Sequence, residues 1–247
     1  MTPTSLYVLS IVFVATLIRS TFGFGEALFA VPLLALCMPL RVATPLVVLL
    51  SITIAAAIVA QDWRSIHLRS SGGLLLPSLA GIPLGLLLLG SRYETVLKVA
   101  LALLILGFAT YSLLGRRTPE LRRDSLGWLL GCGFLAGVLG AAYGMNGPPL
   151  VVYGTMRRWS AQHFRATLQG YFLPASVLAM AGYWLAGMWV PQVTRYYLLS
   201  LLGVVPAIAL GRAANRRLHP QRFLRYVHAG LLLIGAVLLV QALRAIA

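Results

Sequence analysis

Two charged side chains stand inside an apolar stretch near the start of the sequence, and they are the first candidates for chemistry. Glu26 is the only acidic residue within an apolar segment, and Arg19 lies two helical turns before it. The two side chains could therefore face one another along a continuous helix. Three interpretations stay open for Glu26: a structural ion pair with Arg19, a carboxylate that takes up and releases protons, or a direct ligand of a substrate. Arg19 could instead extend its charged end toward a polar interface.

The backbone of two glycine-rich stretches is the second candidate. Gly140–Pro149 and the weaker copy Phe22–Ala27 both interrupt apolar runs, where glycine and proline should break a helix. Pro148 suits the first turn of a new helix, with Asn146 as a possible cap. The start of a half-helix offers free amide hydrogens and a partial positive charge, which suit an oxyanion. The glycines that would let a substrate approach the backbone are Gly23, Gly25, Gly144 and Gly147; the alternative is a kink or close helix packing.

A few further polar side chains lie near these breaks in the sequence. Asn146 could also hydrogen-bond a substrate, and Thr44 and Thr167 begin the helices that follow the two breaks, where they could point into the centre. Arg165 could attract anions at the inner mouth or anchor the loop at the membrane surface. Four residues of the second half form a polar group around the second break: Asn146, Arg165, Thr167 and Gln169.

The composition is that of an integral membrane protein. Hydrophobic residues make up 60% of the chain and charged residues 10%, with a mean hydropathy of +0.88, whereas about 25% of a soluble domain is charged. The net charge of +15 comes from cations in short loops between apolar runs. We therefore expect membrane lipids, and no nucleic acid, as partners of these cations.

The sequence offers little for catalysis or for metal binding. Cys37 and Cys132 lie inside apolar segments, and the histidines show no ligand spacing, so we expect no disulfide, no metal and no cofactor. There is no Ser–His pair in a recognisable motif and no pair of aspartates inside the apolar segments, which leaves a membrane-embedded enzyme as the weakest hypothesis. No nucleotide-binding loop is visible, so energy should come from gradients.

A single transmembrane domain over residues 1–247 is expected, because the polar loops are too short for a separate soluble domain. The fold class is an all-α membrane protein with about eight hydrophobic segments. They are Leu6–Leu40, Val42–Ala60, Gly73–Gly90, Thr95–Leu114, Leu126–Met156, Ala166–Ala186, Tyr196–Ala213 and Phe223–Ala245.

The segments that contain the breaks are predicted to be re-entrant. A straight helix over Leu126–Met156 would measure about 46 Å, against a hydrocarbon core of about 30 Å. If both broken segments return to their starting side and the N-terminus lies outside, fourteen basic residues fall inside and five outside, as the positive-inside rule demands. The inside set is Arg64, Arg69, Arg116, Arg117, Arg122, Arg123, Arg157, Arg158, Arg165, Arg212, Arg216, Arg217, Arg222 and Arg225; the outside set is Arg41, Arg92, Lys98, Arg195 and Arg244.

An internal repeat points to the same arrangement. Ala43-Thr44 recurs as Ala166-Thr167 and Pro83 recurs as Pro206, both at the same offset, and the break at Gly23 recurs near that offset at Gly144. We predict repeat 1 at about 1–115 and repeat 2 at about 125–247. Each repeat then holds a broken segment and three crossings, so the second is inverted relative to the first.

The motifs themselves resemble a known family. Leu28–Leu33 followed by Pro39–Thr44 resembles the first-half pattern of the sulfite exporter TauE/SafE family, and Gly137–Pro149 followed by Phe164–Thr167 resembles its second motif. Glu26 departs from the pattern, because a small residue is usual there. The resemblance implies a multi-pass inner-membrane permease for sulfite, sulfoacetate and related anions.

The function expected from these features is secondary transport. A permease or exporter would move small anions, such as sulfur-containing or organic acids. It would do so by alternating access around the two broken helices. Proton coupling through Glu26 and Arg19 is one option. A channel for anions or small solutes is the alternative. The expected location is the bacterial inner membrane with the N-terminus outside, and a homo-oligomer is one possible assembly.

Overall fold

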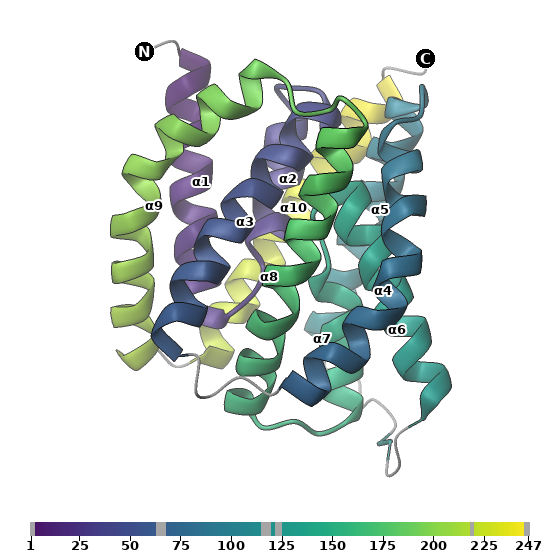
Figure 1. The fold of residues 1–247 in the computed structure, drawn as a ribbon. Coiled ribbons are helices and arrows are strands. Elements are labelled where there is room, and N and C mark those ends of the chain that lie inside the picture. The colour runs from purple at the N-terminus through teal and green to yellow at the C-terminus, as the bar shows by residue number, and fades with distance from the viewer. Residues whose placement is uncertain (1–2, 63–67, 115–119, 122–124, 218–219, 245–247) are drawn as a thin grey trace.

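The computed structural model describes residues 3–62, 68–114, 120–121, 125–217 and 220–244. The side chains of residues 3, 61–62, 68–70, 161–162, 165–166, 215–217 and 220–227 lie outside this description. The described ranges form helices without any strand, as the all-α prediction requires. The helices are α1 (Pro3–Phe22), α2 (Glu26–Ala35), α3 (Leu40–Asp62), α4 (Leu68–Leu89), α5 (Glu94–Leu114), α6 (Leu126–Tyr143), α7 (Gly147–Met156), α8 (Ala161–Leu185), α9 (Pro191–Arg217) and α10 (Pro220–Arg244) (Figure 1).

The first glycine stretch turns the chain back on itself. Helix α1 ends at Phe22 and α2 begins at Glu26, and the backbone between them has φ of 87° at Gly23 and 102° at Gly25. Such left-handed angles are easy for glycine and strained for other residues. The hydroxyl of Tyr7 donates to the carbonyl of Leu33 over 3.3 Å. Because Tyr7 lies near the start of α1 and Leu33 near the end of α2, α2 runs back along α1.

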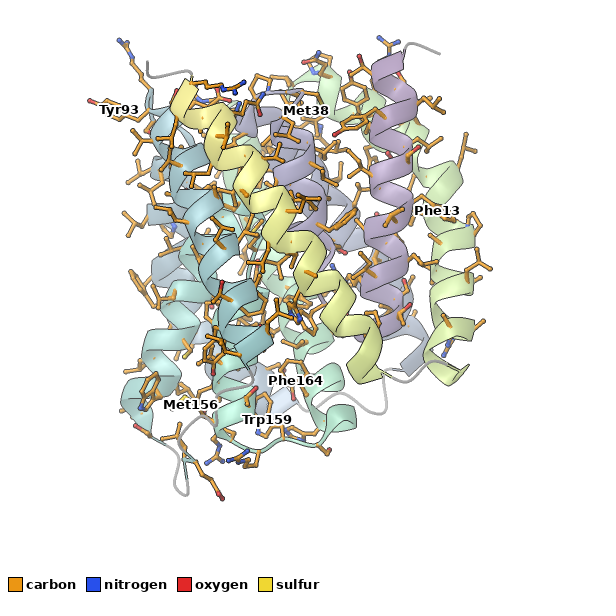
Figure 2. The ribbon with its side chains drawn as sticks, turned by 180° about the vertical axis from the view of Figure 1, so that it is seen from behind. Phe13, Met38, Tyr93, Met156, Trp159 and Phe164 are labelled. Carbon is orange, nitrogen blue, oxygen red and sulfur yellow. The ribbon has the colours of Figure 1, made fainter. Side chains whose placement is uncertain are left out.

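The second glycine stretch forms a similar hairpin, which opens toward the other end of the molecule. Helix α6 ends at Tyr143, Gly144 follows with φ of 67°, and α7 begins at Gly147. The amide of Leu121, which precedes α6, donates to the carbonyl of Met156 at the end of α7 over 2.9 Å. Helix α7 therefore returns toward the start of α6. In Figure 2 Met156 and Met38 lie at opposite ends of the bundle, so the two hairpins open in opposite directions.

The remaining helices run along the long axis of the bundle. Six described helices are long and apolar enough to cross a membrane: α1, α3, α4, α5, α6 and α9. Helix α2 and the described end of α10 are shorter apolar helices. The start of α1 and the end of α10 lie at the same end of the bundle (Figure 1). The predicted apolar segments thus correspond to helices, with the two broken segments each divided in two.

Glycines bring α4 and α6 into close contact. A Cβ added to Gly81 would lie 2.2 Å from the carbonyl oxygen of Phe134, and one added to Gly137 would lie 2.4 Å from the carbonyl oxygen of Ser78. The backbones are therefore closer than any larger residue allows, a packing mode typical of membrane helices. The hydroxyl of Ser78 also donates to the carbonyl of Gly133 over 2.8 Å.

The main helix contacts form pairs. Helix α4 packs along α6, and α9 packs along α1; α3 lies against α8, and α5 lies against α10. Helix α4 also contacts α8, and α9 also contacts α3. The short helix α2 packs against α1 and α3, and the short helix α7 packs against α6 and α8.

Candidate functional site

The two breaks face one pocket. Residues from both glycine stretches line it, together with single residues from α1, α3 and α8, and its empty space is about 330 Å³ when the open mouth is counted. Its lining is Arg19, Phe24, Gly25, Glu26, Ala27, Leu28, Ser51, Gly144, Met145, Asn146, Gly147 and Phe172. The sequence predicted two related breaks, and the structure brings them together.

Arg19 is the charged centre of this pocket. Its side chain is only 2% exposed, and Nη1 lies 2.5 Å from Oε1 of Glu26. Nη1 also donates to the hydroxyl of Ser51 over 2.6 Å, and Nη2 donates to the side-chain carbonyl of Gln169 over 3.3 Å. The guanidinium carbon stands 4.9 Å from the ring centre of Phe172, a cation–π contact. Residues from α1, α2, α3 and α8 therefore fix one buried cation.

Glu26 is the first residue of α2, where a negative charge is favoured by the helix dipole. The continuous helix that would have aligned it with Arg19 does not exist, since the chain turns between them. The turn itself brings the two side chains together. Only one carboxylate oxygen is used: Oε2 of Glu26 and Nε of Arg19 are buried and have no hydrogen-bond partner among the described residues. The ion pair, one of the three interpretations of Glu26, is therefore present, and the turn forms it instead of a continuous helix.

Asn146 does not cap α7, and that prediction is wrong. It occupies the position before Gly147, but its side chain makes no capping hydrogen bond. Instead its amide lies against α6, where a Cβ on Gly140 would fall 2.5 Å from Oδ1 of Asn146. It also interacts with the hydroxyl of Tyr171, whose oxygen is 2.6 Å from that of Ser78. These neighbours hold the Asn146 amide beside the pocket instead of over the helix end.

The start of α7 differs from the start of α2 in its donors. Pro148 lies in the first turn of α7, as predicted, and Pro149 follows it. Neither residue has an amide hydrogen, so two of the donors that a helix start normally offers are missing. Helix α2 begins with Glu26, Ala27 and Leu28, which all carry amides. The first break therefore presents both the cation and the larger number of backbone donors.

Three predicted site residues do not line the pocket. The carbonyl of Gly23 accepts a hydrogen bond from Nε2 of Gln169 over 2.7 Å. Thr44 is buried and its hydroxyl contacts the carbonyl of Ala142 over 3.5 Å. Thr167 is fully buried, and its hydroxyl has no partner among the residues that are described. Gly25, Gly144, Asn146 and Gly147 do line the pocket, whereas the side chain of Arg165 lies outside the described residues.

Sequence reasoning missed some of the residues around the pocket. Ser51 binds Arg19 but stands in the long apolar run of α3, where a single serine carries little signal. Gln169 was grouped with the second break, yet it binds both Arg19 and Gly23 of the first break. Phe24 and Phe172 form apolar walls that no spacing rule singles out.

Comparison with known proteins identifies the family. No match is found among curated proteins or among solved structures. A family model does match, with the description "Sulfite exporter TauE/SafE", and the match covers residues 8–239, which include both breaks and every residue named in the pocket. The chain therefore belongs to the sulfite exporter TauE/SafE family of membrane transporters.

Proposed function

We propose that this protein is a secondary transporter of small anions in the bacterial inner membrane, with its N-terminus outside. Sulfur-containing or organic acids, such as sulfite or sulfoacetate, are the substrates that the family name and the site chemistry favour. The observation that carries the proposal is the buried guanidinium of Arg19 in a pocket lined by both helix breaks. A cation fixed by several side chains suits an oxyanion that must shed its water.

The backbone adds to this preference for anions. The pocket reaches the first residues of both α2 and α7. A helix start carries a partial positive charge and amides without intrahelical acceptors. Phe24, Met145 and Phe172 contribute apolar wall to the pocket, which lowers the local dielectric constant and strengthens the electrostatic attraction.

The arrangement of the helices supports two inverted repeats with re-entrant hairpins. If α1–α5 and α6–α10 exchange places, the pair α4–α6 becomes the pair α9–α1, and the pair α4–α8 becomes the pair α9–α3. The pairs α3–α8 and α5–α10 are unchanged, because in each pair the two helices simply take one another's place. With the two hairpins opening toward opposite ends (Figure 2), this is the layout in which one half rocks against the other around a central site.

Glu26 supplies a means of coupling to protons. Its carboxylate is buried and bound to Arg19 through one oxygen only. A buried acid of this kind is a common element of proton relays in transporters. Proton coupling would supply energy without a nucleotide, and it would make transport depend on the proton gradient.

Flux measurements on reconstituted protein test the proposal. Purified protein in liposomes should move sulfite, sulfoacetate or a small carboxylate with saturable kinetics and with counter-transport of the same anion. Arg195→Gln serves as a control, because Arg195 is exposed and does not line the pocket. Folded protein that moves no anion of such a panel would contradict the proposal, and flux that never saturates and shows no counter-transport would favour a channel.

A further inference from the structure

Glu26 already occupies the position that an anion would take. Its Oε1 lies 2.5 Å from Nη1 of Arg19, inside the pocket that both breaks line. Oε2 of Glu26 and Nε of Arg19 meet no partner in the described part of the chain, although both are buried. The pair therefore leaves one donor and one acceptor unused. An anion with several oxygens could use that donor if the carboxylate were not there.

The charges in the pocket do not allow both anions to bind at once. Among the described residues that line it, Arg19 carries the one positive charge and Glu26 the one negative charge. A second anion beside an ionised Glu26 would leave one uncompensated negative charge in a buried site, which is strongly unfavourable. Substrate binding thus requires Glu26 to lose its charge or to move away.

A second cavity shows where Glu26 could move. It lies between α1, α2 and α3 and has a volume of about 10 Å³, so a carboxyl group enters it only when the side chains around it shift. Glu26 lines both cavities. Apart from Glu26 and Thr16, the residues around this second cavity are alanine, valine, leucine and isoleucine. A neutral carboxylic acid can be tolerated in such surroundings far better than a carboxylate can.

No other ionisable group of the described neighbours competes for Glu26. Arg19 on α1 is the charged residue that faces it. Tyr111 on α5 lines neither of the two cavities that Glu26 borders, and the described titratable side chains named next bind elsewhere. Glu94 pairs with Lys98, Arg41 donates to the carbonyl of Leu89, Tyr143 to that of Leu97 and Tyr7 to that of Leu33, His228 packs on Phe108, and Arg244 lines a separate groove with Leu36.

We infer that substrate and Glu26 exchange on Arg19. An incoming anion takes the guanidinium, while the Glu26 carboxylate accepts one proton from solvent and turns, as a neutral acid, into the second cavity. The only covalent change is the new O–H bond on Glu26. The inference rests on the proposed function and adds two properties to it: each anion enters together with one proton, and the preferred substrate carries a single negative charge.

The preference for a substrate with one negative charge follows from the charges of Arg19 and Glu26 in the pocket. A monoanion on Arg19 with Glu26 protonated leaves the site neutral, as it is in the resting pair. A dianion would leave one excess negative charge in the same place. Of the two proposed substrates, sulfite can bind as its monoanion, whereas sulfoacetate is a dianion at neutral pH and is expected to bind more weakly. We therefore expect acetate or methanesulfonate to bind more tightly than malonate or sulfate, by about tenfold or more. The transported unit of a monoanion and a proton has no net charge.

Counting protons on the whole protein tests the exchange. Purified wild-type protein in weakly buffered detergent solution is titrated with acetate and with methanesulfonate, and a pH indicator records proton uptake. About one proton per bound anion is expected for the wild type. Glu26→Gln should bind the same anions with no proton uptake and with an affinity that does not vary with pH. Binding by the wild type without proton uptake would overturn the inference, whether or not the variant folds.

A second test separates the two cavities. Ala30 lines the second cavity and not the anion pocket, so Ala30→Val should hinder the movement of Glu26 and weaken anion binding about tenfold. Ala35→Val is the matched control, because Ala35 is a fully buried alanine of the same helix that lines neither cavity. In a Glu26→Ala background Ala30→Val should have no effect on binding. An equal loss in both backgrounds would show that Glu26 does not use this cavity.

The two proposals fail in different ways. If no anion of the panel binds to or crosses with folded protein, the proposed function is wrong and this inference falls with it. If anions bind and are transported but bring no proton, the transporter proposal stands and the exchange on Arg19 is wrong. If dianions bind as tightly as monoanions, the single-charge preference is wrong.

Discussion

The side-chain amide of Gln169 donates to the carbonyl of Gly23 over 2.7 Å. The same side chain accepts a hydrogen bond from Nη2 of Arg19 over 3.3 Å. Gln169 belongs to α8, whereas Gly23 directly follows α1 and Arg19 lies one turn earlier, within α1. One residue from the second half of the chain thus holds both the turn and the cation of the first break.

Gln169→Leu should loosen the first break. The change leaves the carbonyl of Gly23 without this donor and removes one acceptor from Arg19, and a buried group left unpaired costs about 1–3 kcal/mol. We expect a lower unfolding temperature in detergent and weaker anion binding. Gln192→Leu is the matched control, because Gln192 is exposed at the start of α9. A variant as stable as the control would contradict the role assigned to Gln169.

Arg19 and Glu26 should behave as a coupled pair in stability measurements. Replacing Arg19 by Met leaves a buried carboxylate without its cation, which typically costs about 3–5 kcal/mol. The double variant Arg19→Met with Glu26→Gln should recover a large part of that loss, because no unpaired charge remains. Thermal or denaturant unfolding of the single and double variants measures the difference. Additive losses would mean that the two charges do not depend on one another.

Gly81→Ala should separate α4 from α6. Its new Cβ would lie 2.2 Å from a backbone oxygen of α6, which cannot yield as a flexible side chain can. Overpacking of this kind costs about 1–3 kcal/mol. Gly131→Ala, on α6 itself, is the control, because a Cβ there meets nothing within 4 Å. A fall in the unfolding temperature of Gly81→Ala, with none for Gly131→Ala, is the expected result.

Cys37 reports which side of the membrane the first hairpin opens to. It lies exposed in the turn between α2 and α3, whereas Cys132 is buried in α6. If the N-terminus is outside and the hairpin is re-entrant, a membrane-impermeant maleimide should label Cys37 from the outside of intact cells. Desolvation by partial burial raises the pKa of the Cys37 thiol. Since the thiolate is the reactive form, labelling should be slow at neutral pH and faster as the pH rises. Labelling that requires permeabilised cells would contradict this topology.

The helix breaks and the Arg19–Glu26 pair could be predicted from the sequence, because each depends on residues that are near one another in the chain. Glycine and proline mark both breaks, and the structure ends α6 at Tyr143 and begins α7 at Gly147, close to the predicted interruption. The isolated charges of Arg19 and Glu26 indicated a pair, which the structure contains. These features follow from residues that are near in sequence, where backbone preference and the cost of a buried charge decide the outcome.

The contacts that complete the site could not be predicted in the same way. Ser51 and Gln169 reach Arg19 from helices that are distant in sequence, and nothing in their local pattern specifies that approach. The cap prediction for Asn146 failed because α6 and Tyr171 take up its side chain. In each case tertiary packing overrides a local preference.

The contacts across the breaks bear on how such a chain arose and how it could be divided. Gln169 of the second half binds the end of α1, and Thr44 of the first half contacts the end of α6 over 3.5 Å. If the chain descends from a duplicated gene, its halves no longer form independent units, since each supplies a polar side chain that the other needs. Two fragments produced from separate genes, cut between α5 and α6, should then accumulate in the membrane only when both are made in the same cell.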